Sequence, residues 1–163
     1  MNNQDIVKQI LNSNIFLTLG TTDGNIPWTS ALFFAADEKY NLYFTSYNDS
    51  LHVKNIIKNP DVAVVIFDSN IIPGSGKGQG IQMKAKCFRV PKEDLIEAIE
   101  VLYSKRFPDR NDWEKNNINP NRFSKPDGYV RVDHIYKIEP EKIYIMDKAP
   151  GKKDIRTEVN INY

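Results

Sequence analysis

Hydroxyl groups, an imidazole and a lysine follow one another closely between Thr45 and Lys54. Ser50 is expected to begin a short helix over 51–58, with His52 in its first turn. A helix N-terminus offers free amide groups and a favourable dipole to an anion. The hydroxyls of Thr45 and Ser50 could donate to phosphate oxygens, and the pKa of histidine suits such a contact near neutral pH. The alternative is that Ser50 only caps the helix.

The other segments that could carry chemistry do not match a complete motif. The glycine-rich loop 73–80 fits neither the phosphate-loop nor the dinucleotide fingerprint and precedes a strand, so we interpret it as a connection between strands. The only two histidines, His52 and His134, cannot form a three-histidine zinc site, and no Gly-x-Ser-x-Gly motif accompanies them. Cys87 lies on the apolar face of a predicted strand, which favours core packing. We therefore predict no metal site and nominate no catalytic residue.

Length and charge restrict the class of protein. The chain has 163 residues, which is typical of one domain, and 22 basic against 21 acidic side chains give a net charge of +1. This balance argues against a dedicated nucleic-acid binder. No segment approaches the ~20 apolar residues of a membrane helix, and no secretory signal is visible. We expect a soluble, cytoplasmic protein.

The order of the strands and helices expected around these residues predicts a small β-barrel with helices on its outside. Asp23-Gly24 is typical of a hairpin turn. Because the predicted strands follow each other closely, the sheet should be mostly antiparallel, and its closure would remove exposed edges. The polar loop 109–127 is long for a compact domain, and loops of this length are often functional or mobile. We expect strands at 15–19, 28–36, 42–45, 62–67, 81–90, 129–138 and 142–146, the last two separated by Glu139-Pro140-Glu141, and helices at 5–12, 51–58 and 91–107.

The order of several motifs resembles the FMN-binding split-barrel family, also called the pyridoxamine 5′-phosphate oxidase-like family. The resemblance covers roughly residues 5–146, and no single motif is as diagnostic as their order. The motifs are Thr21-Thr22-Asp23-Gly24, Pro27, Asp37 to Thr45, Ser50 to Asn55, Asn59-Pro60-Asp61-Val62-Ala63, Gly80 to Met83 and Tyr103 to Pro108.

The resemblance implies a mainly β, α+β fold, namely an antiparallel six-stranded split β-barrel over residues 1–148, followed by a charged C-terminal tail over 149–163. It also implies a homodimer with FMN in grooves between the subunits. In the family, one strand runs along the flavin ring, a strand end and helix start hold the phosphate, and a glutamine reaches the flavin. The matching residues are Trp28, Thr29, Ser30, Ala31 and Leu32 for the ring, Thr45, Ser46, Ser50, Leu51, His52 and Lys54 for the phosphate, and Gln82.

The sequence departs from the family pattern at two of these positions. Family oxidases often carry arginine where Thr29 stands and lysine where His52 stands, and a hydroxyl cannot reproduce the bidentate contact of a guanidinium. The C-terminal Arg-x-His element that reads a pyridoxine substrate is not evident. The resemblance therefore implies a flavoprotein that is an FMN-dependent oxidoreductase with a small-molecule substrate other than pyridoxamine phosphate. The alternatives are a flavin or haem carrier and a structural dimer on the same fold.

Overall fold

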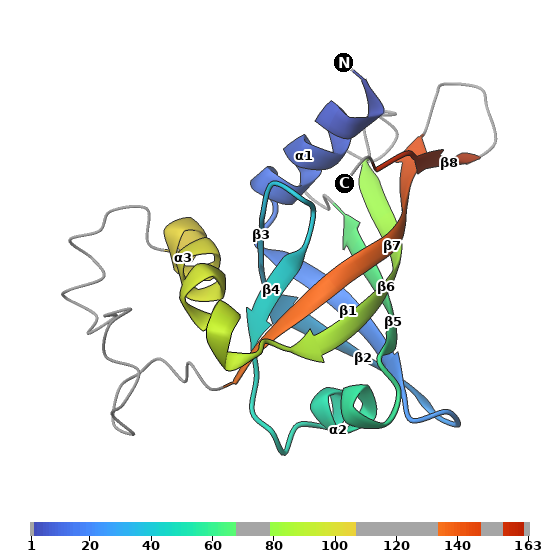
Figure 1. Ribbon diagram of the computed structural model, residues 1–163. Helices are drawn as coiled ribbons and strands as arrows, with labels where there is room; N and C mark the ends of the chain where they lie inside the picture. Colours follow the sequence, from blue (N-terminus) through green and yellow to red (C-terminus); the bar gives the residue numbers. More distant parts are fainter. Residues whose placement is uncertain (1, 68–78, 107–133, 148–154, 162–163) are drawn as a thin grey trace.

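The computed structural model describes residues 2–67, 79–106, 134–147 and 155–161 (Figure 1). The glycine-rich loop, apart from its last two residues, and the long polar loop 109–127 lie outside the described residues. The elements in chain order are α1 (Asn3–Ser13), β1 (Phe16–Thr22), β2 (Pro27–Phe33), β3 (Ala35–Ala36), β4 (Leu42–Thr45), α2 (Leu51–Lys58), β5 (Asp61–Phe67), β6 (Gly80–Arg89), a short 3-10 helix (Lys92–Asp94), α3 (Leu95–Arg106), β7 (Ile135–Asp147) and β8 (Ile155–Val159).

All described strands belong to one antiparallel sheet with the order β2-β1-β5-β6-β7-β4-β3, and β8 pairs with β7. β2 and β3 stand at opposite ends of this order, yet only Phe34 separates them in the chain. The sheet must therefore curl until its two ends meet. This confirms the predicted mainly β split barrel. The described sheet has eight strands rather than six, because β3 is a separate two-residue strand and residues 155–159 of the expected tail add β8.

The core lies inside the curled sheet, between α1 at one end of the barrel and α2 at the other (Figure 1). Alternate residues of β1, β5 and most of β6 point inward. Cys87 is fully buried among them, so its predicted packing role is confirmed, and burial raises the pKa of its thiol to about 12. A second, smaller cluster forms where α3 packs on the outside, against β3, β4 and β7.

Two predicted strand boundaries were wrong. The strand expected over 28–36 is interrupted at Phe34, whose side chain is fully buried where the chain passes from one end of the sheet to the other. The break expected at Pro140 does not occur, and β7 runs through it. The register between β6 and β7 shifts here, so that Lys84 faces Lys142 and Ala85 faces Pro140. Such a bulge accommodates a residue that has no amide hydrogen to donate.

The predicted hairpin turn between β1 and β2 is confirmed. Gly24 has φ +104°, a conformation that favours glycine, and Asp23 accepts hydrogen bonds from the amides of Asn25 and Ile26. These amides lower the pKa of the Asp23 carboxyl. The turn fixes the start of β2, the strand that carries Trp28 and Ser30. Within the described part of the chain, no helix combines the length and apolarity needed to span a membrane.

Candidate functional site

His52 is the centre of a polar cluster at the end of the barrel that α2 covers. It lies in the first turn of α2, and the residue is only 8% exposed. Its Nδ1 lies 3.1 Å from Oγ of Ser30 on β2. Its Nε2 lies 2.6 Å from Oγ of Ser46 and 3.2 Å from Oγ of Ser50. The cluster therefore joins β2, the loop after β4 and the start of α2 around one imidazole.

The alternative interpretation, that the hydroxyl of Ser50 only caps the helix, is wrong. Ser50 occupies the N-cap position, but its side chain makes no capping hydrogen bond. Its hydroxyl instead donates to the carbonyl of Tyr47 at 2.8 Å and lies 3.0 Å from Oγ of Ser46. The first turn of α2 also contains no acidic residue. The side chain of Ser50 thus leaves the first amides of α2 uncapped, and the hydroxyls of Ser46 and Ser50 lie together at this end of the helix. Free amides at a helix start favour the binding of an anion.

The loop 46–50 is also held by His134, which directly precedes β7, and by Tyr136 on β7, and the sequence did not suggest either contact. The amide of Ser46 donates to the carbonyl of His134 at 3.1 Å. The hydroxyl of Tyr136 donates to Oδ1 of Asn48 at 3.1 Å, and Nδ2 of Asn48 lies 3.3 Å from Nε2 of His134. The rings of Phe44 and Tyr136 stack with centroids 5.4 Å apart. These partners are 86 to 88 positions from Asn48, so no local pattern could reveal them.

The residues nominated on β2 divide between its two faces. Trp28 and Ser30 lie on the face toward the polar cluster, and the Trp28 indole donates to Oγ of Ser30 at 3.1 Å. Leu32 continues this face but packs against the core. Thr29 and Ala31 lie on the opposite face and are exposed. The alternation of a strand makes this division unavoidable.

Gln82 lies on the same outer face of the sheet as Thr29 and Ala31. It pairs with Val65 on β5, Val65 pairs with Thr18 on β1, and Thr18 pairs with Ala31. Within one chain it therefore does not join the cluster around His52. Three further nominated residues are exposed near that cluster without a described role in it: Thr45, Leu51 and Lys54. The nominated residues that the structure brings together are Trp28, Ser30, Ser46, Ser50 and His52.

The electrostatics of the cluster favour a neutral histidine. Burial lowers the pKa of His52 below its ordinary value. The imidazole is therefore uncharged at neutral pH and can offer one N–H donor. Together with the hydroxyls of Ser46 and Ser50, it forms a set of donors suited to phosphate oxygens.

The outer face of β1, β2 and β5 is an exposed surface of small and apolar residues. Phe16 is 57% exposed, and its ring meets that of Phe33 edge to face at 6.3 Å. β2 is a terminal strand, and its second edge pairs with no described strand. The residues of this outer face are Phe16, Thr18, Gly20, Thr29, Ala31, Phe33, Ala63, Val65 and Phe67.

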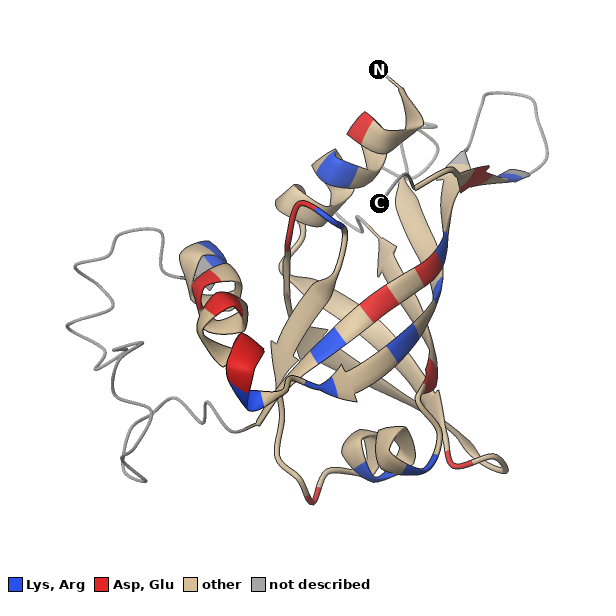
Figure 2. Ribbon diagram, viewed as in Figure 1, with Lys and Arg blue, Asp and Glu red and all other residues tan. Residues whose placement is uncertain are grey.

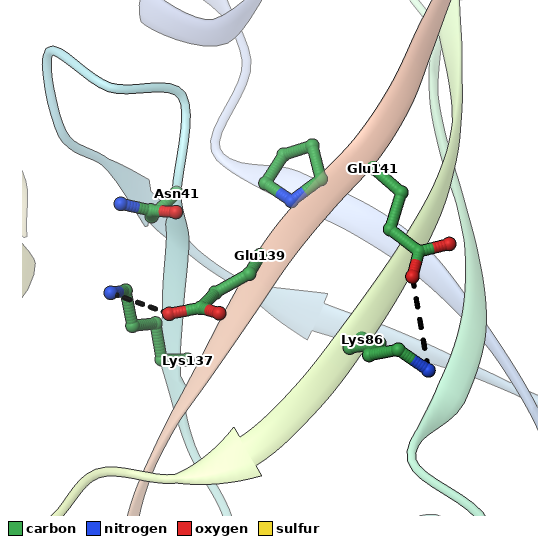
Figure 3. A pocket seen from close by; sticks show the side chains of 6 residues that line it. Asn41, Lys86, Lys137, Glu139 and Glu141 are labelled. Carbon is green, nitrogen blue, oxygen red and sulfur yellow. Dashed lines mark ion pairs between the residues drawn. The ribbon is translucent and has the colours of Figure 1, made fainter. Parts of the chain in front are cut away.

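A separate groove of about 460 Å³ lies over β4, β6 and β7 (Figure 3). It is lined by Asn41, Lys86, Lys137, Glu139, Pro140 and Glu141. Its charges pair with each other: Nζ of Lys137 lies 2.8 Å from Glu139, and Nζ of Lys86 lies 3.8 Å from Glu141.

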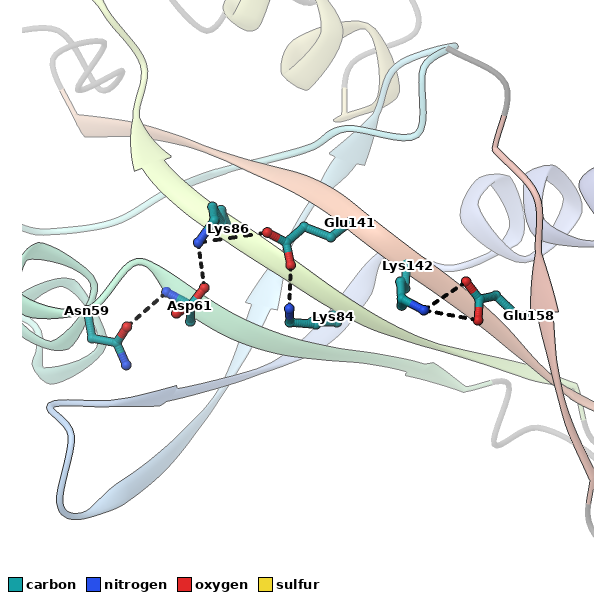
Figure 4. A network of polar contacts seen from close by, with 7 residues as sticks. All are labelled: Asn59, Asp61, Lys84, Lys86, Glu141, Lys142 and Glu158. Atoms are coloured by element: carbon teal, nitrogen blue, oxygen red, sulfur yellow. Dashed lines mark hydrogen bonds and ion pairs between the residues drawn. The ribbon is translucent and has the colours of Figure 1, made fainter.

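These pairs belong to a wider network across β5, β6, β7 and β8 (Figure 4). Both signs of charge alternate over this face of the barrel (Figure 2). Exposed pairs of this kind contribute little to stability and leave no net charge for a ligand. Among the described residues, no group of three acidic, histidine or cysteine side chains could hold a metal ion.

Comparison with known proteins agrees with the fold. The family model described as pyridoxamine 5′-phosphate oxidase matches residues 4–147. No curated protein sequence matches the chain. A solved structure described as a putative pyridoxamine 5′-phosphate oxidase from Listeria innocua aligns with a TM-score of 0.61 and 22% identity, over 90% of this chain and 99% of its own.

Two other similar structures carry names that refer to haem. The heme binding protein from Mycobacterium smegmatis aligns with a TM-score of 0.68 and 10% identity over 98% of this chain, which spans 58% of that protein. The heme storage protein HutZ from Vibrio cholerae aligns with a TM-score of 0.64 and 16% identity, over 89% of this chain and 95% of its own. At these identities the likeness shows a shared fold.

Proposed function

We propose that this chain, which belongs to the pyridoxamine 5′-phosphate oxidase family, is a flavoprotein that binds FMN and acts as an FMN-dependent oxidoreductase on a small molecule. The observation that carries the proposal is the uncapped start of α2, where the imidazole of His52 and the hydroxyls of Ser46 and Ser50 lie within hydrogen-bond distance of one another. A single cysteine, buried and unpaired, is compatible with a reducing compartment. We therefore include in the proposal that the protein acts in the cytoplasm.

The phosphate of FMN suits the donors at the start of α2. Ser46 and Ser50 offer hydroxyls that can rotate, His52 offers an N–H, and the first amides of the helix point the same way. Lys54 is exposed one turn into the helix and adds a positive charge nearby. No carboxylate in the first turn of α2 opposes an anion.

The flavin ring suits the free edge of β2. This edge pairs with no described strand, so the backbone groups of residues 28–32 on that side can bond a planar, polar ring. The side chain of Trp28 is 46% exposed beside it and offers an aromatic surface. Backbone recognition explains why side chains as plain as Ala31 and Leu32 occupy this strand.

A second copy of the chain completes the proposed site. Gln82, Thr29 and Ala31 lie on the outer face of the sheet, while His52 and its partners lie at the barrel end. One chain cannot bring both sets onto one ligand, but a homodimer that packs these outer faces together can place ligands between the copies. Apart from Asp61 at the start of β5, the outer face of β1, β2 and β5 is uncharged and partly aromatic, as such an interface requires.

When bound, FMN supplies the hydride chemistry through its ring. The part of the chain is to bind and orient. Ser46, Ser50 and His52 hold the phosphate, and the edge of β2 fixes the ring. We assign no proton-transfer residue to the described part of the chain.

The visible absorption spectrum of the purified protein, recorded before and after incubation with FMN and gel filtration, tests the proposal. We expect flavin bands that remain at about one FMN per chain and bleach on anaerobic addition of NADH or NADPH. Retained bands that neither donor bleaches would support a flavin carrier and contradict the oxidoreductase. A colourless protein would contradict FMN binding.

A haem-binding protein is the second candidate, because two structurally similar proteins are named for haem. Titration with hemin distinguishes the two cofactors. A sharp Soret band at one haem per chain, together with no retained FMN, would favour this candidate. We expect FMN to be retained and hemin to bind without a defined stoichiometry.

A further inference from the structure

We propose that Ser30, directed by the indole of Trp28, is a positioning residue that holds His52 as the tautomer protonated at Nε2. The inference rests on the proposed function only where FMN is the probe, because the hydrogen bonds involved lie within this chain. It gives Ser30 a role through His52 instead of a direct contact with a ligand.

The first step of the argument starts from β2. The indole N–H of Trp28 can only donate, so Oγ of Ser30 accepts at 3.1 Å. Ser30 has one hydroxyl hydrogen, and Nδ1 of His52 at 3.1 Å is the acceptor that the described residues offer it. Ser30 therefore donates and Nδ1 accepts. A neutral imidazole that accepts at Nδ1 carries its proton at Nε2.

The second step starts independently from α2 and reaches the same tautomer. The carbonyl of Tyr47 can only accept, so Ser50 donates its hydrogen there at 2.8 Å. Oγ of Ser50 then has no hydrogen left for Nε2 of His52 at 3.2 Å, so this contact is a hydrogen bond only where Nε2 donates, and Oγ of Ser46 at 2.6 Å can accept the same proton. Nε2 is therefore a donor. Two groups with fixed roles, at opposite ends of the cluster, assign one proton position.

This proton position decides what the cluster can do. Nε2 lies 2.6 Å from Oγ of Ser46, a distance typical of a nucleophile and its base. Because Nε2 already carries a proton, it cannot remove the proton of Ser46. The geometry instead offers Nε2–H to an anion at the start of α2, and the hydroxyls of Ser46 and Ser50 become donors to it when they rotate away from their present partners. By keeping the proton at Nε2, Ser30 and Trp28 suit the cluster to anion binding and prevent His52 from acting as a base toward Ser46.

Nitrogen-15 NMR of the labelled protein without FMN tests the tautomer directly. The chain has two histidines, so the variant His134→Gln assigns the signals of His52. At pH 7.5 we expect a protonated Nε2 and an unprotonated Nδ1 whose chemical shift indicates an accepted hydrogen bond. A protonated Nδ1 would overturn the inference.

The variants Ser30→Ala and Ser30→Thr test the role of the hydroxyl. In Ser30→Ala we expect the hydrogen-bond shift of Nδ1 to disappear and the affinity for FMN to fall roughly five-fold, the value of one hydrogen bond. Riboflavin, which has no phosphate, should bind unchanged. Ser30→Thr keeps the hydroxyl and should restore both signals. The control Ser104→Ala removes a hydroxyl on α3 whose hydrogen bond, among the described residues, goes to the carbonyl of Val101, and it should change neither.

Trp28→Phe tests the indole separately. Without the donor that directs Ser30, we expect a smaller change of the Nδ1 shift in the same direction, and an unchanged shift would remove Trp28 from the mechanism. If Ser30→Ala changes neither the Nδ1 shift nor FMN affinity, the inference fails. If the wild type binds no FMN but the Nδ1 shift still depends on Ser30, the inference about His52 stands and the proposed function fails.

Discussion

Ser30 on β2 and His52 on α2 are 22 positions apart in the sequence, yet Oγ of Ser30 lies 3.1 Å from Nδ1 of His52. This contact joins the strand proposed to run beside the flavin ring to the helix proposed to hold its phosphate. A shift of β2 or of α2 would therefore alter the hydrogen bond between Ser30 and His52.

His52→Ala should weaken FMN binding more than it weakens the fold. The variant removes a donor to a charged phosphate, an interaction worth about 1.5–3 kcal/mol, or roughly 10- to 100-fold in affinity. Riboflavin affinity should stay the same, because the ring contacts of β2 remain. Fluorescence titration with both ligands measures the difference. Equal retention of FMN by wild type and variant would contradict the phosphate assignment.

Two substitutions of Ser50 should act in opposite directions on stability. Because the hydroxyl of Ser50 makes no cap, Ser50→Ala should cost only its hydrogen bond to Tyr47, about 0.5–1.5 kcal/mol. Ser50→Asp can cap α2 and interact favourably with its dipole, so it should raise the free energy of unfolding.

The same two variants should both lose affinity for FMN. Ser50→Ala removes a hydroxyl donor, and Ser50→Asp places a negative charge where the phosphate is proposed to bind. Urea denaturation and FMN titration of the same samples provide the comparison. If Ser50→Asp bound FMN as tightly as the wild type, the anion would have to bind elsewhere.

Thr18→Glu should convert the proposed dimer to a monomer without unfolding it. Thr18 is exposed on the outer face, between the uncharged residues Ala31 on β2 and Val65 on β5. A carboxylate there would be buried unpaired between two copies, which is costly. Light scattering should give twice 18.8 kDa for the wild type and 18.8 kDa for the variant.

A matched control for the dimer is Ile96→Glu, which places the same charge on the exposed side of α3, where Ile96 is 55% exposed. It should leave the mass at twice 18.8 kDa. A wild type that is monomeric at all concentrations would contradict the shared site.

The parts of the structure that the sequence predicted depend on local pattern. The helix over 51–58, the turn at Asp23-Gly24 and the burial of Cys87 all follow from a few neighbouring residues. The division of Trp28 and Thr29 onto opposite faces also follows from strand alternation, and it could have been predicted from the sequence.

The parts that could not be predicted depend on partners far away in the chain. Pro140 lies within β7 at a bulge, where the register between β6 and β7 shifts. The hydroxyl of Ser50 contacts Tyr47, Ser46 and His52 instead of capping the amides of α2. A capping signal in one sequence cannot reveal that competition, since it depends on how the loop after β4 folds.

Gly80→Ala should destabilise the protein, while Gly20→Ala should be tolerated. A Cβ on Gly80 would lie 2.6 Å from Cδ2 of Phe67 and 3.1 Å from the carbonyl oxygen of Ile66, so backbone as well as side chain must move. We expect a loss of about 1–3 kcal/mol, typical of overpacking. A Cβ on Gly20 would meet Ala63 at an ordinary 3.5 Å. Urea denaturation of both variants decides it, and equal midpoints would contradict the crowding at Gly80.

The stability of the protein should depend on the protonation of His52. Burial lowers its pKa in the folded protein below the value of about 6.5 expected in the unfolded chain. As the pH falls below 6.5, the unfolded chain therefore binds a proton that the folded protein still resists. The stability is complete above that pH and is lost as the pH falls through the folded pKa.

The hydrogen bonds proposed for Ser30 act in the same direction as burial. A proton added at Nδ1 would meet an oxygen that already accepts from Trp28 and would deprive the hydroxyl of Ser30 of its acceptor. Between pH 7.5 and 5, the free energy of unfolding should consequently fall more steeply for the wild type than for His52→Gln, which cannot titrate. Identical slopes would mean that His52 titrates alike in both states and that burial does not keep it neutral.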